Sequence, residues 1–202
     1  MKVIGITGGV RSGPTQILTY LQEHTNCRII VADKVAHELE EPGEVCYEQI
    51  VTLLGRGILT EDGRINKSEM ASRIFGDKNL LIRINQIVHP AVKEYISKAI
   101  AKERGKGQID YLFIEAALLI EGGYSGIVDE MWYIHTDESV RRERLKLSRG
   151  YSDEKIDDII KEQLTEEEFY RHCSVVIDNS KALQNAFQQI DEKLGEDLCQ
   201  KQ

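Results

Sequence analysis

The chain has 202 residues, of which 41% are hydrophobic and 30% charged, and its formal net charge is -8. This balance is typical of an ordinary globular protein, and the length suits one domain with insertions. The negative charge argues against broad nucleic-acid binding, which depends on Lys and Arg neutralising phosphates. The longest apolar runs are too short to span a membrane.

The cysteines and the first residues indicate a cytoplasmic protein. Cys27, Cys46, Cys173 and Cys199 are far apart and lack metal-binding or redox spacing, so we expect free thiols in a reducing compartment. The opening residues lead directly into an expected strand, without an apolar signal region.

The first predicted elements are a strand at residues 3–7 and a helix at residues 15–23, joined by a glycine-rich turn. Ile17, Leu18 and Leu21 have helical spacing, and the turn reads GGVRSGPTQ. A phosphate-binding P-loop needs G-x-x-x-x-G-K-[ST] at this place. Gly8, Gly13 and Thr15 match that pattern, but Pro14 replaces its lysine.

These nine residues leave two interpretations open. In one, the turn is a P-loop whose backbone N–H groups wrap phosphates. In the other, Gly8 and Gly13 only shape a tight turn, and Pro14 is a favourable first residue of the helix.

The remaining elements predict an α/β protein. Apolar strands are expected at residues 27–32, 111–114, 131–135 and 175–177, and a helix at residues 34–41 ends before Pro42 and Gly43. Short apolar strands separated by helices indicate a parallel sheet covered on both faces. Residues 44–104 read as a long helical region with a turn at residues 61–63, and residues 138–172 as a charged, helical insertion.

Several motifs, taken in order, resemble those of dephospho-coenzyme A kinases. They are GITGG near the start, VADKVAHELEEPG at 31–43, ILTEDGRINKSEM at 58–70, RIFGD at 73–77, IVHPAV at 87–92, AALLIE at 116–121 and VVIDNS at 175–180.

The resemblance implies a P-loop kinase fold, with a five-stranded parallel sheet flanked by helices, a helical substrate-binding subdomain and a helical lid. We expect a single P-loop kinase-like domain over residues 1–202. Its core would comprise about 1–43, 108–137 and 173–202, the substrate-binding insertion about 44–107 and the lid about 138–172.

The family's reaction moves the γ-phosphoryl group of ATP to the ribose 3′-hydroxyl of dephospho-CoA, with Mg²⁺, in coenzyme A synthesis. The resemblance therefore implies ATP and dephospho-CoA or a CoA-like ligand as partners, without nucleic acid or membrane. Nothing in the sequence sets an oligomeric state.

The resemblance also assigns the nucleotide site. We expect the nucleotide to be bound by Gly8, Gly9, Arg11, Ser12, Gly13, Thr15 and Asn179. The Thr15 hydroxyl matches the family's Mg²⁺ ligand, and Asn179 is expected beside the adenine.

Asp33 is the expected catalytic residue. The family usually reads Asp-Ala-Asp where this chain reads Val31-Ala32-Asp33, so one carboxylate is retained, either to accept the 3′-hydroxyl proton or to orient the metal through water. The alternative is that Asp33 caps the following helix, and the two roles are compatible.

Further candidates lie on the substrate side and in the lid. Lys67, Arg73, His89 and Glu121 match the family's substrate side, and Arg141, Arg144 and Arg149 are expected to close over the phosphates as lid residues. The alternative for each cation is an ordinary solvated charge.

Pro14 leaves two functions open. It removes both the lysine charge and a backbone N–H, and losing one such donor commonly costs about 10²- to 10³-fold in turnover. The side chain of Arg11 either replaces that charge or blocks the loop. The chain is therefore either an impaired dephospho-CoA kinase or a non-catalytic nucleotide- or CoA-binding pseudokinase.

Overall fold

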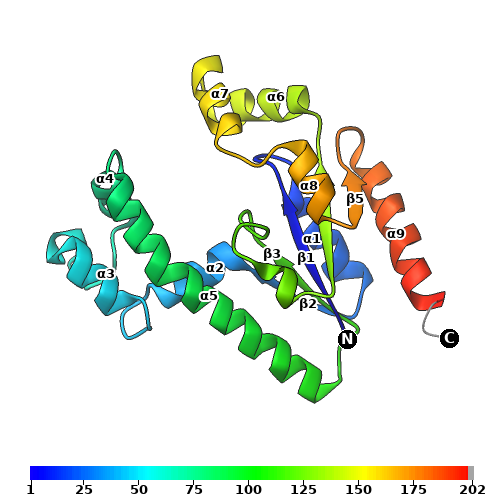
Figure 1. Ribbon diagram of the computed structural model, residues 1–202, viewed down its shortest axis with the longest axis horizontal. Helices are drawn as coiled ribbons and strands as arrows, with labels where there is room; N and C mark the ends of the chain where they lie inside the picture. The colour runs from blue at the N-terminus through cyan, green and yellow to red at the C-terminus, as the bar shows by residue number, and fades with distance from the viewer. Residues whose placement is uncertain (200–202) are drawn as a thin grey trace. The chain divides into compact units, whose positions relative to one another are not determined.

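The computed structural model describes residues 1–199, and its centre is a five-stranded sheet with the order β2-β3-β1-β4-β5 (Figure 1). Strand β1 (Lys2–Gly8) pairs in parallel with β3 (Tyr111–Glu115) and β4 (Glu130–His135), and β4 pairs in parallel with β5 (Val175–Asp178). Strand β2 (Cys27–Val31) forms the other edge. The five predicted strands are confirmed to within a residue at each end.

The inner strands form because nearly all their side chains are apolar and buried. Ile4 and Ile6 of β1 and Phe113 of β3 are fully buried, as expected for a parallel sheet covered on both faces. The register pairs Ile6 with Glu115 and Thr7 with Tyr133. The carboxyl ends of β1, β3 and β4 therefore lie at the same edge of the sheet, where ligands bind in open α/β sheets.

The chain divides into two compact units, and the first comprises Met1–Ile29 with Gly107–Gln202. Its helices are α1 (Pro14–His24), η2 (Tyr124–Gly126), α6 (Glu138–Arg149), α7 (Asp153–Lys161), α8 (Glu166–His172) and α9 (Leu183–Cys199). Helix α9 packs on β5 and α1, and α8 packs on β4 (Figure 1). The helical character expected for residues 138–172 is confirmed. The sequence also predicts a C-terminal helix at residues 181–202, whose last residues lie outside the described part of the chain.

The second unit, Ile30–Lys106, is helical. It comprises α2 (Ala32–Leu39), α3 (Tyr47–Leu54), η1 (Arg56–Ile58), α4 (Lys67–Ile74) and α5 (Lys78–Lys106), together with the end of β2. Helix α5 packs against α2, α3 and α4 through a buried face that includes Ile84, Val88 and Ile96. The predicted turn lies between η1 and α4, where Leu59 and Ile65 form an isolated antiparallel bridge.

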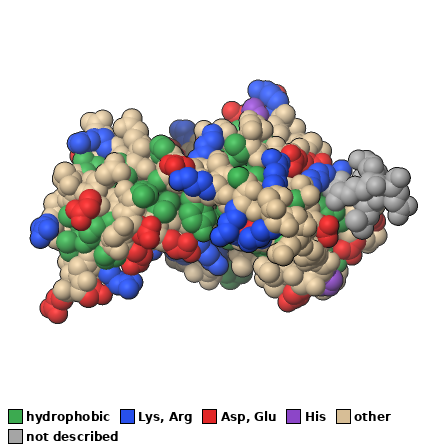
Figure 2. All heavy atoms as spheres, turned by 90° about the horizontal axis from the view of Figure 1, so that it is seen from below, with side chains coloured by type: hydrophobic (Ala, Val, Ile, Leu, Met, Phe, Trp, Pro, Cys, Tyr) green, Lys and Arg blue, Asp and Glu red, His purple; other side chains and the backbone are tan. Residues whose placement is uncertain are grey.

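Acidic and basic side chains are interspersed on the face that Figure 2 displays. Cys27, Cys46 and Cys173 are free thiols, and burial raises the pKa of Cys173 to about 11. The side chain of Cys199 lies outside the described residues. Within the part of the chain that the structure describes, no helix has the length and apolarity needed to cross a membrane.

Candidate functional site

The glycine-rich turn runs from the end of β1 at Gly8 to the start of α1 at Pro14. Gly13 precedes the helix in the left-handed conformation, with φ of 84°. A residue with a side chain would be strained at this φ. Arg11 has φ of 60°, the only positive φ among the described non-glycine residues. Pro14 is the first residue of the helix, where its missing N–H breaks no helical hydrogen bond.

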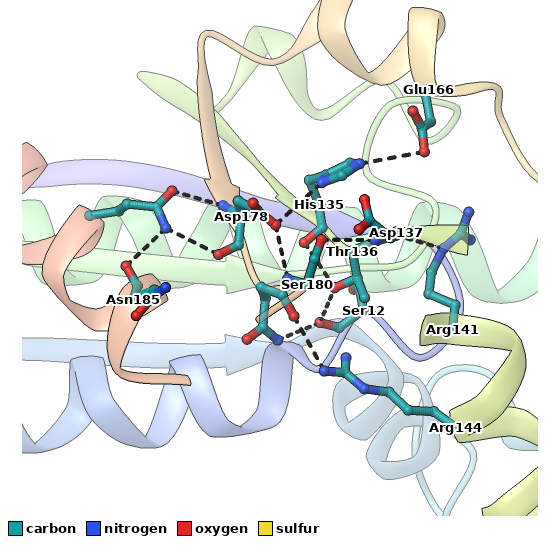
Figure 3. Close-up of polar contacts among 12 residues, drawn as sticks. Ser12, His135, Thr136, Asp137, Arg141, Arg144, Glu166, Asp178, Ser180 and Asn185 are labelled. Atoms are coloured by element: carbon teal, nitrogen blue, oxygen red, sulfur yellow. Dashed lines mark hydrogen bonds and ion pairs between the residues drawn. The ribbon is translucent and has the colours of Figure 1, made fainter. Parts of the chain in front are cut away.

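Buried side chains from two strand ends hold the loop's main chain. The carbonyl oxygen of Ser12 accepts hydrogen bonds from Thr136 Oγ1 at 3.1 Å and from Asn179 Nδ2 at 2.7 Å (Figure 3). Asn179 is only 2% exposed. Its amide group therefore positions the loop, and its role beside the adenine stays a prediction.

Arg144 contacts the same loop from α6. Its Nη1 atom donates to the carbonyl oxygen of Arg11 at 3.0 Å, and its Nη2 atom donates to the carbonyl oxygen of Asn179 at 3.2 Å. Arg141, one turn earlier, is buried and donates through Nε to the carbonyl oxygen of Thr136 at 3.0 Å. Both arginines are thus held by neutral oxygens of the protein.

Arg149 differs from these two arginines. It is exposed in the last turn of α6. Since a helix rises about 1.5 Å per residue, it lies about 12 Å along the helix from Arg141. The structure therefore brings Arg141 and Arg144 to the loop and leaves Arg149 in solvent.

A cavity of about 270 Å³ opens beside the loop. Its wall includes Gly8, Gly9, Arg11, Ser12 and Pro14 from the loop, together with Glu115, Glu121, Glu162, Gln163 and Phe169. The Ser12 hydroxyl is buried and has no hydrogen-bond partner among the described residues, so it can donate to a ligand oxygen. Of the residues predicted to bind the nucleotide, Gly8, Gly9, Arg11 and Ser12 lie in this wall and Gly13, Thr15 and Asn179 do not, and Glu121 of the predicted substrate side also lies there.

The oxygen donors near this cavity fit Mg²⁺, which takes one or two protein oxygens and completes its shell with water and phosphates. Thr15 is exposed in the first turn of α1, and Glu115 ends the strand beside β1. Among the described residues no group of three or more His, Cys, Asp or Glu side chains could hold a metal. A Mg²⁺ ion here would therefore depend on the nucleotide's phosphates.

His135 is a polar residue of this edge that the sequence reasoning missed. At the end of β4, its Nδ1 atom is 3.5 Å from Asp178 Oδ1 and its Nε2 atom is 3.5 Å from Glu166 Oε1 (Figure 3). Burial acts to raise the pKa of Asp178, but hydrogen bonds from Ser180 and His135 outweigh it and lower that pKa. The sequence signal that could have indicated this residue is its position at the end of a predicted strand.

Within the helical unit, Asp33 is the second residue of α2 and is exposed. The prediction that it caps this helix is wrong, because α2 begins at Ala32 and Val31 occupies the capping position without a side-chain hydrogen bond. The helix starts earlier than its apolar spacing indicated. The carboxylate of Asp33 is thus left accessible for chemistry.

The other candidates of this unit lie on α4 and α5. Lys67 is the first residue of α4 and is exposed, and His89 is exposed on α5 beside Pro90. Arg73 Nη1 donates to the carbonyl oxygen of Leu54, the last residue of α3, at 2.6 Å, and Arg73 Nε bonds Glu69 at 3.2 Å. Arg73 therefore ties α4 to α3, whereas Lys67 and His89 face solvent.

A parallel sheet with a glycine loop between its central strand and a helix, and with arginines from a neighbouring helix on that loop, defines a P-loop kinase in fold. A family model described as dephospho-CoA kinase matches residues 2–185. The chain belongs to the dephospho-CoA kinase family.

Individual relatives agree with this assignment. A dephospho-CoA kinase of Carboxydothermus hydrogenoformans is 34% identical over 190 residues, covering 94% of this chain and 91% of that protein. The structure of TT1252 from Thermus thermophilus has a TM-score of 0.78 at 22% identity, covering 96% of this chain and 97% of that one. That of a dephospho-CoA kinase from Campylobacter jejuni has a TM-score of 0.73 at 19% identity, covering 97% of each chain. Both structural likenesses concern the fold.

Proposed function

We propose that this chain transfers the γ-phosphoryl group of ATP to the ribose 3′-hydroxyl of dephospho-CoA. The observation that carries the proposal is that hydrogen bonds from neighbouring elements hold the main chain of the loop, although Pro14 stands in place of the lysine. The main-chain carbonyl oxygens of Arg11, Ser12 and Asn179 accept hydrogen bonds from three side chains. The donors are Thr136, just after β4, Asn179, just after β5, and Arg144 of α6. Because phosphoryl transfer depends on positioning and electrostatics, a held loop retains much of what catalysis needs.

The loop offers several neutral donors to phosphate oxygens. The loop lies at the start of α1, where the helix dipole favours an anion. Within it the Ser12 N–H donates to the Gly9 carbonyl oxygen at 3.0 Å and the Val10 N–H to Gln163 Oε1 at 3.1 Å, so a phosphate would compete with these acceptors. The hydroxyl of Ser12 adds a donor that the protein leaves unused among the described residues. When bound with the nucleotide, Mg²⁺ would neutralise charge on the phosphates, with Thr15 and Glu115 as its protein oxygens.

In this proposal Asp33 accepts the proton of the attacking hydroxyl, which requires an accessible carboxylate. The helical region at residues 44–107 binds dephospho-CoA, with Lys67 and His89 as exposed contacts, and residues 138–172 serve as the lid. Arg73 contributes by keeping α3 and α4 together.

A pseudokinase remains the second candidate, and Pro14 is the observation that favours it. The residue supplies neither a positive charge nor an N–H to the loop. Such a protein would bind ATP or a CoA-like ligand without turning it over.

The Asp33→Asn variant tests the reaction, with Glu38→Gln on the same helix as the matched control. We expect Asp33→Asn to lower the turnover of dephospho-CoA phosphorylation by about 10²- to 10⁴-fold, and to leave the KM for ATP unchanged. The Glu38→Gln variant should match wild type. Equal turnover in both variants would contradict the role of Asp33, and absence of turnover in wild type would favour the pseudokinase.

A further inference from the structure

Arg141 is a buried cation whose hydrogen bonds go to neutral groups. The residue is 7% exposed, and it donates to two neutral oxygens, the Thr136 carbonyl at 3.0 Å and Gln163 Oε1 at 3.3 Å. In the part of the chain that the structure describes, no carboxylate forms an ion pair with it. Burying a charge without a counter-charge is costly, so such a residue is expected to serve an anion that binds from outside.

The guanidinium of Arg141 lies directly against the loop. A Cβ atom added to Gly9 would be 2.4 Å from Arg141 Nη1, so a side chain there would require the guanidinium to shift. The guanidinium therefore lies next to the loop at Gly9. This cation comes from α6 and not from the loop itself.

Gln163 joins this guanidinium to the loop's backbone. Its Oε1 atom accepts from the backbone N–H of Val10 at 3.1 Å and from Arg141 Nη1 at 3.3 Å. A P-loop N–H and a guanidinium that converge on one oxygen are the donors that a phosphate oxygen prefers. A neutral amide oxygen is a weaker acceptor for them than a phosphate oxygen.

The cavity beside the loop shows how a ligand would reach these donors. Gln163 and Val10 belong to the wall of the 270 Å³ cavity, whereas Arg141 lies outside that wall. The side chain of Gln163 is therefore the group that a ligand in the cavity must displace to contact Arg141.

We propose that the Val10 N–H and the Arg141 guanidinium form a phosphate-oxygen subsite, which Gln163 Oε1 fills until a nucleotide displaces it. At this subsite Arg141 supplies the positive charge that Pro14 does not. The inference deepens the proposed function, because it takes the phosphates to be those of the ATP that the reaction consumes.

The test measures the affinity of the non-hydrolysable ATP analogue AMPPNP, with Mg²⁺, by calorimetry. We expect Arg141→Gln to weaken binding about 10- to 100-fold, the range for hydrogen bonds to a charged group. Lys193→Gln removes a cation of α9 that lies 3.6 Å from Glu130, and as the control it should bind AMPPNP as wild type does. Adding Pro14→Lys to Arg141→Gln should restore at least about tenfold of the lost affinity, which a purely structural role of Arg141 would not allow.

A second variant keeps Arg141 in place, in case its replacement unfolds the protein. Gln163→Glu keeps the shape of the side chain but places a carboxylate beside Arg141. It should raise the melting temperature and weaken the binding of AMPPNP at least about tenfold. Gln184→Glu, exposed on α9, adds the same charge elsewhere and should leave affinity unchanged.

The failures of the two proposals are distinguishable. Wild-type affinity in Gln163→Glu, equal affinity in Arg141→Gln and Lys193→Gln, or no binding of AMPPNP to wild type would overturn the subsite. The subsite also fails, with the reaction intact, if Arg141→Gln phosphorylates dephospho-CoA with wild-type kcat and KM. If the variants change AMPPNP affinity as expected but wild type does not phosphorylate dephospho-CoA, the subsite is supported and the proposed reaction is wrong.

Discussion

Arg144 donates to the main-chain carbonyl oxygen of Arg11 at 3.0 Å, so one arginine holds the backbone of another in a left-handed conformation. An arginine expected in the lid over the phosphates is thereby used to shape the loop. Since the same guanidinium also binds the carbonyl oxygen of Asn179 at 3.2 Å, it ties the loop to the end of β5.

Removal of this tie should loosen the nucleotide site. We expect Arg144→Ala to raise the KM for ATP about tenfold and to lower the melting temperature, because two hydrogen bonds from a charged donor are lost. Steady-state kinetics with dephospho-CoA in excess provide the measurement. Lys193→Ala, which removes a cation of α9, is the control. Equal KM values in the two variants would show that the loop keeps its shape without Arg144.

Arg11→Gly tests the strain at position 11 and the possibility that the Arg11 side chain replaces the lysine. A left-handed conformation costs a non-glycine residue about 1–2 kcal/mol, partly offset by the entropy of glycine in the unfolded chain. We expect the free energy of unfolding to rise by up to about 1 kcal/mol in chemical denaturation. The KM for ATP should stay within about threefold if Arg141 carries the charge. A loss of tenfold or more would assign that charge to Arg11.

Arg73 and Lys67 were predicted together as substrate contacts, and the structure separates them. We expect Arg73→Ala to lower the free energy of unfolding by about 1 kcal/mol, because it leaves the Leu54 carbonyl without its donor. Lys67→Ala should leave stability unchanged and raise the KM for dephospho-CoA, since its side chain faces solvent. Thermal unfolding and substrate titration of both variants distinguish these effects, and identical profiles would contradict them.

Alkaline pH should destabilise the protein through Tyr133. Burial raises the pKa of Tyr133 to about 12 from 10.0, and its ring stacks on Phe169 at 4.5 Å. The protonated side chain is favoured in the fold, so this stability is full below pH 10.0 and is lost as pH rises from about 10 to about 12. The free energy of unfolding falls by roughly 2–3 kcal/mol over this range, because one pKa unit corresponds to about 1.36 kcal/mol.

The Tyr133→Phe variant keeps the stacking and removes the ionisation. Its free energy of unfolding, measured by denaturation at each pH, should fall less steeply above pH 10 than that of wild type. Tyr151→Phe, at a half-buried ring whose centroid is 4.3 Å from Lys155 Nζ, is the control. Parallel curves for wild type and Tyr133→Phe would contradict the burial of a protonated hydroxyl.

The strands and the loop could be predicted because their signals are local. Apolar runs such as YLFI and MWYIH mark buried parallel strands, and the glycine spacing marks the turn. The start of α2 was missed because no capping side chain marks it. The alternative that Asp33 caps the helix therefore placed the cap two residues after Val31, which occupies that position.

The roles of the polar residues could not be predicted because they depend on contacts between distant residues. Arg141, Arg144 and Arg149 look alike in a charged sequence, yet of these three only Arg141 and Arg144 lie against the loop, at Gly9 and Arg11. The contact between Val10 and Gln163 joins residues 153 positions apart. A spacing rule cannot indicate which arginine of a helix faces a loop so far away in sequence.

The most direct test of the central claim is the rate at which the purified wild-type chain converts dephospho-CoA and ATP to CoA and ADP with Mg²⁺, followed by mass spectrometry beside Pro14→Lys. We expect wild type to turn over, and Pro14→Lys to gain no more than about tenfold, because Arg141 already contributes a positive charge. If wild type forms no CoA while Pro14→Lys does, the chain is a pseudokinase and the claim is wrong.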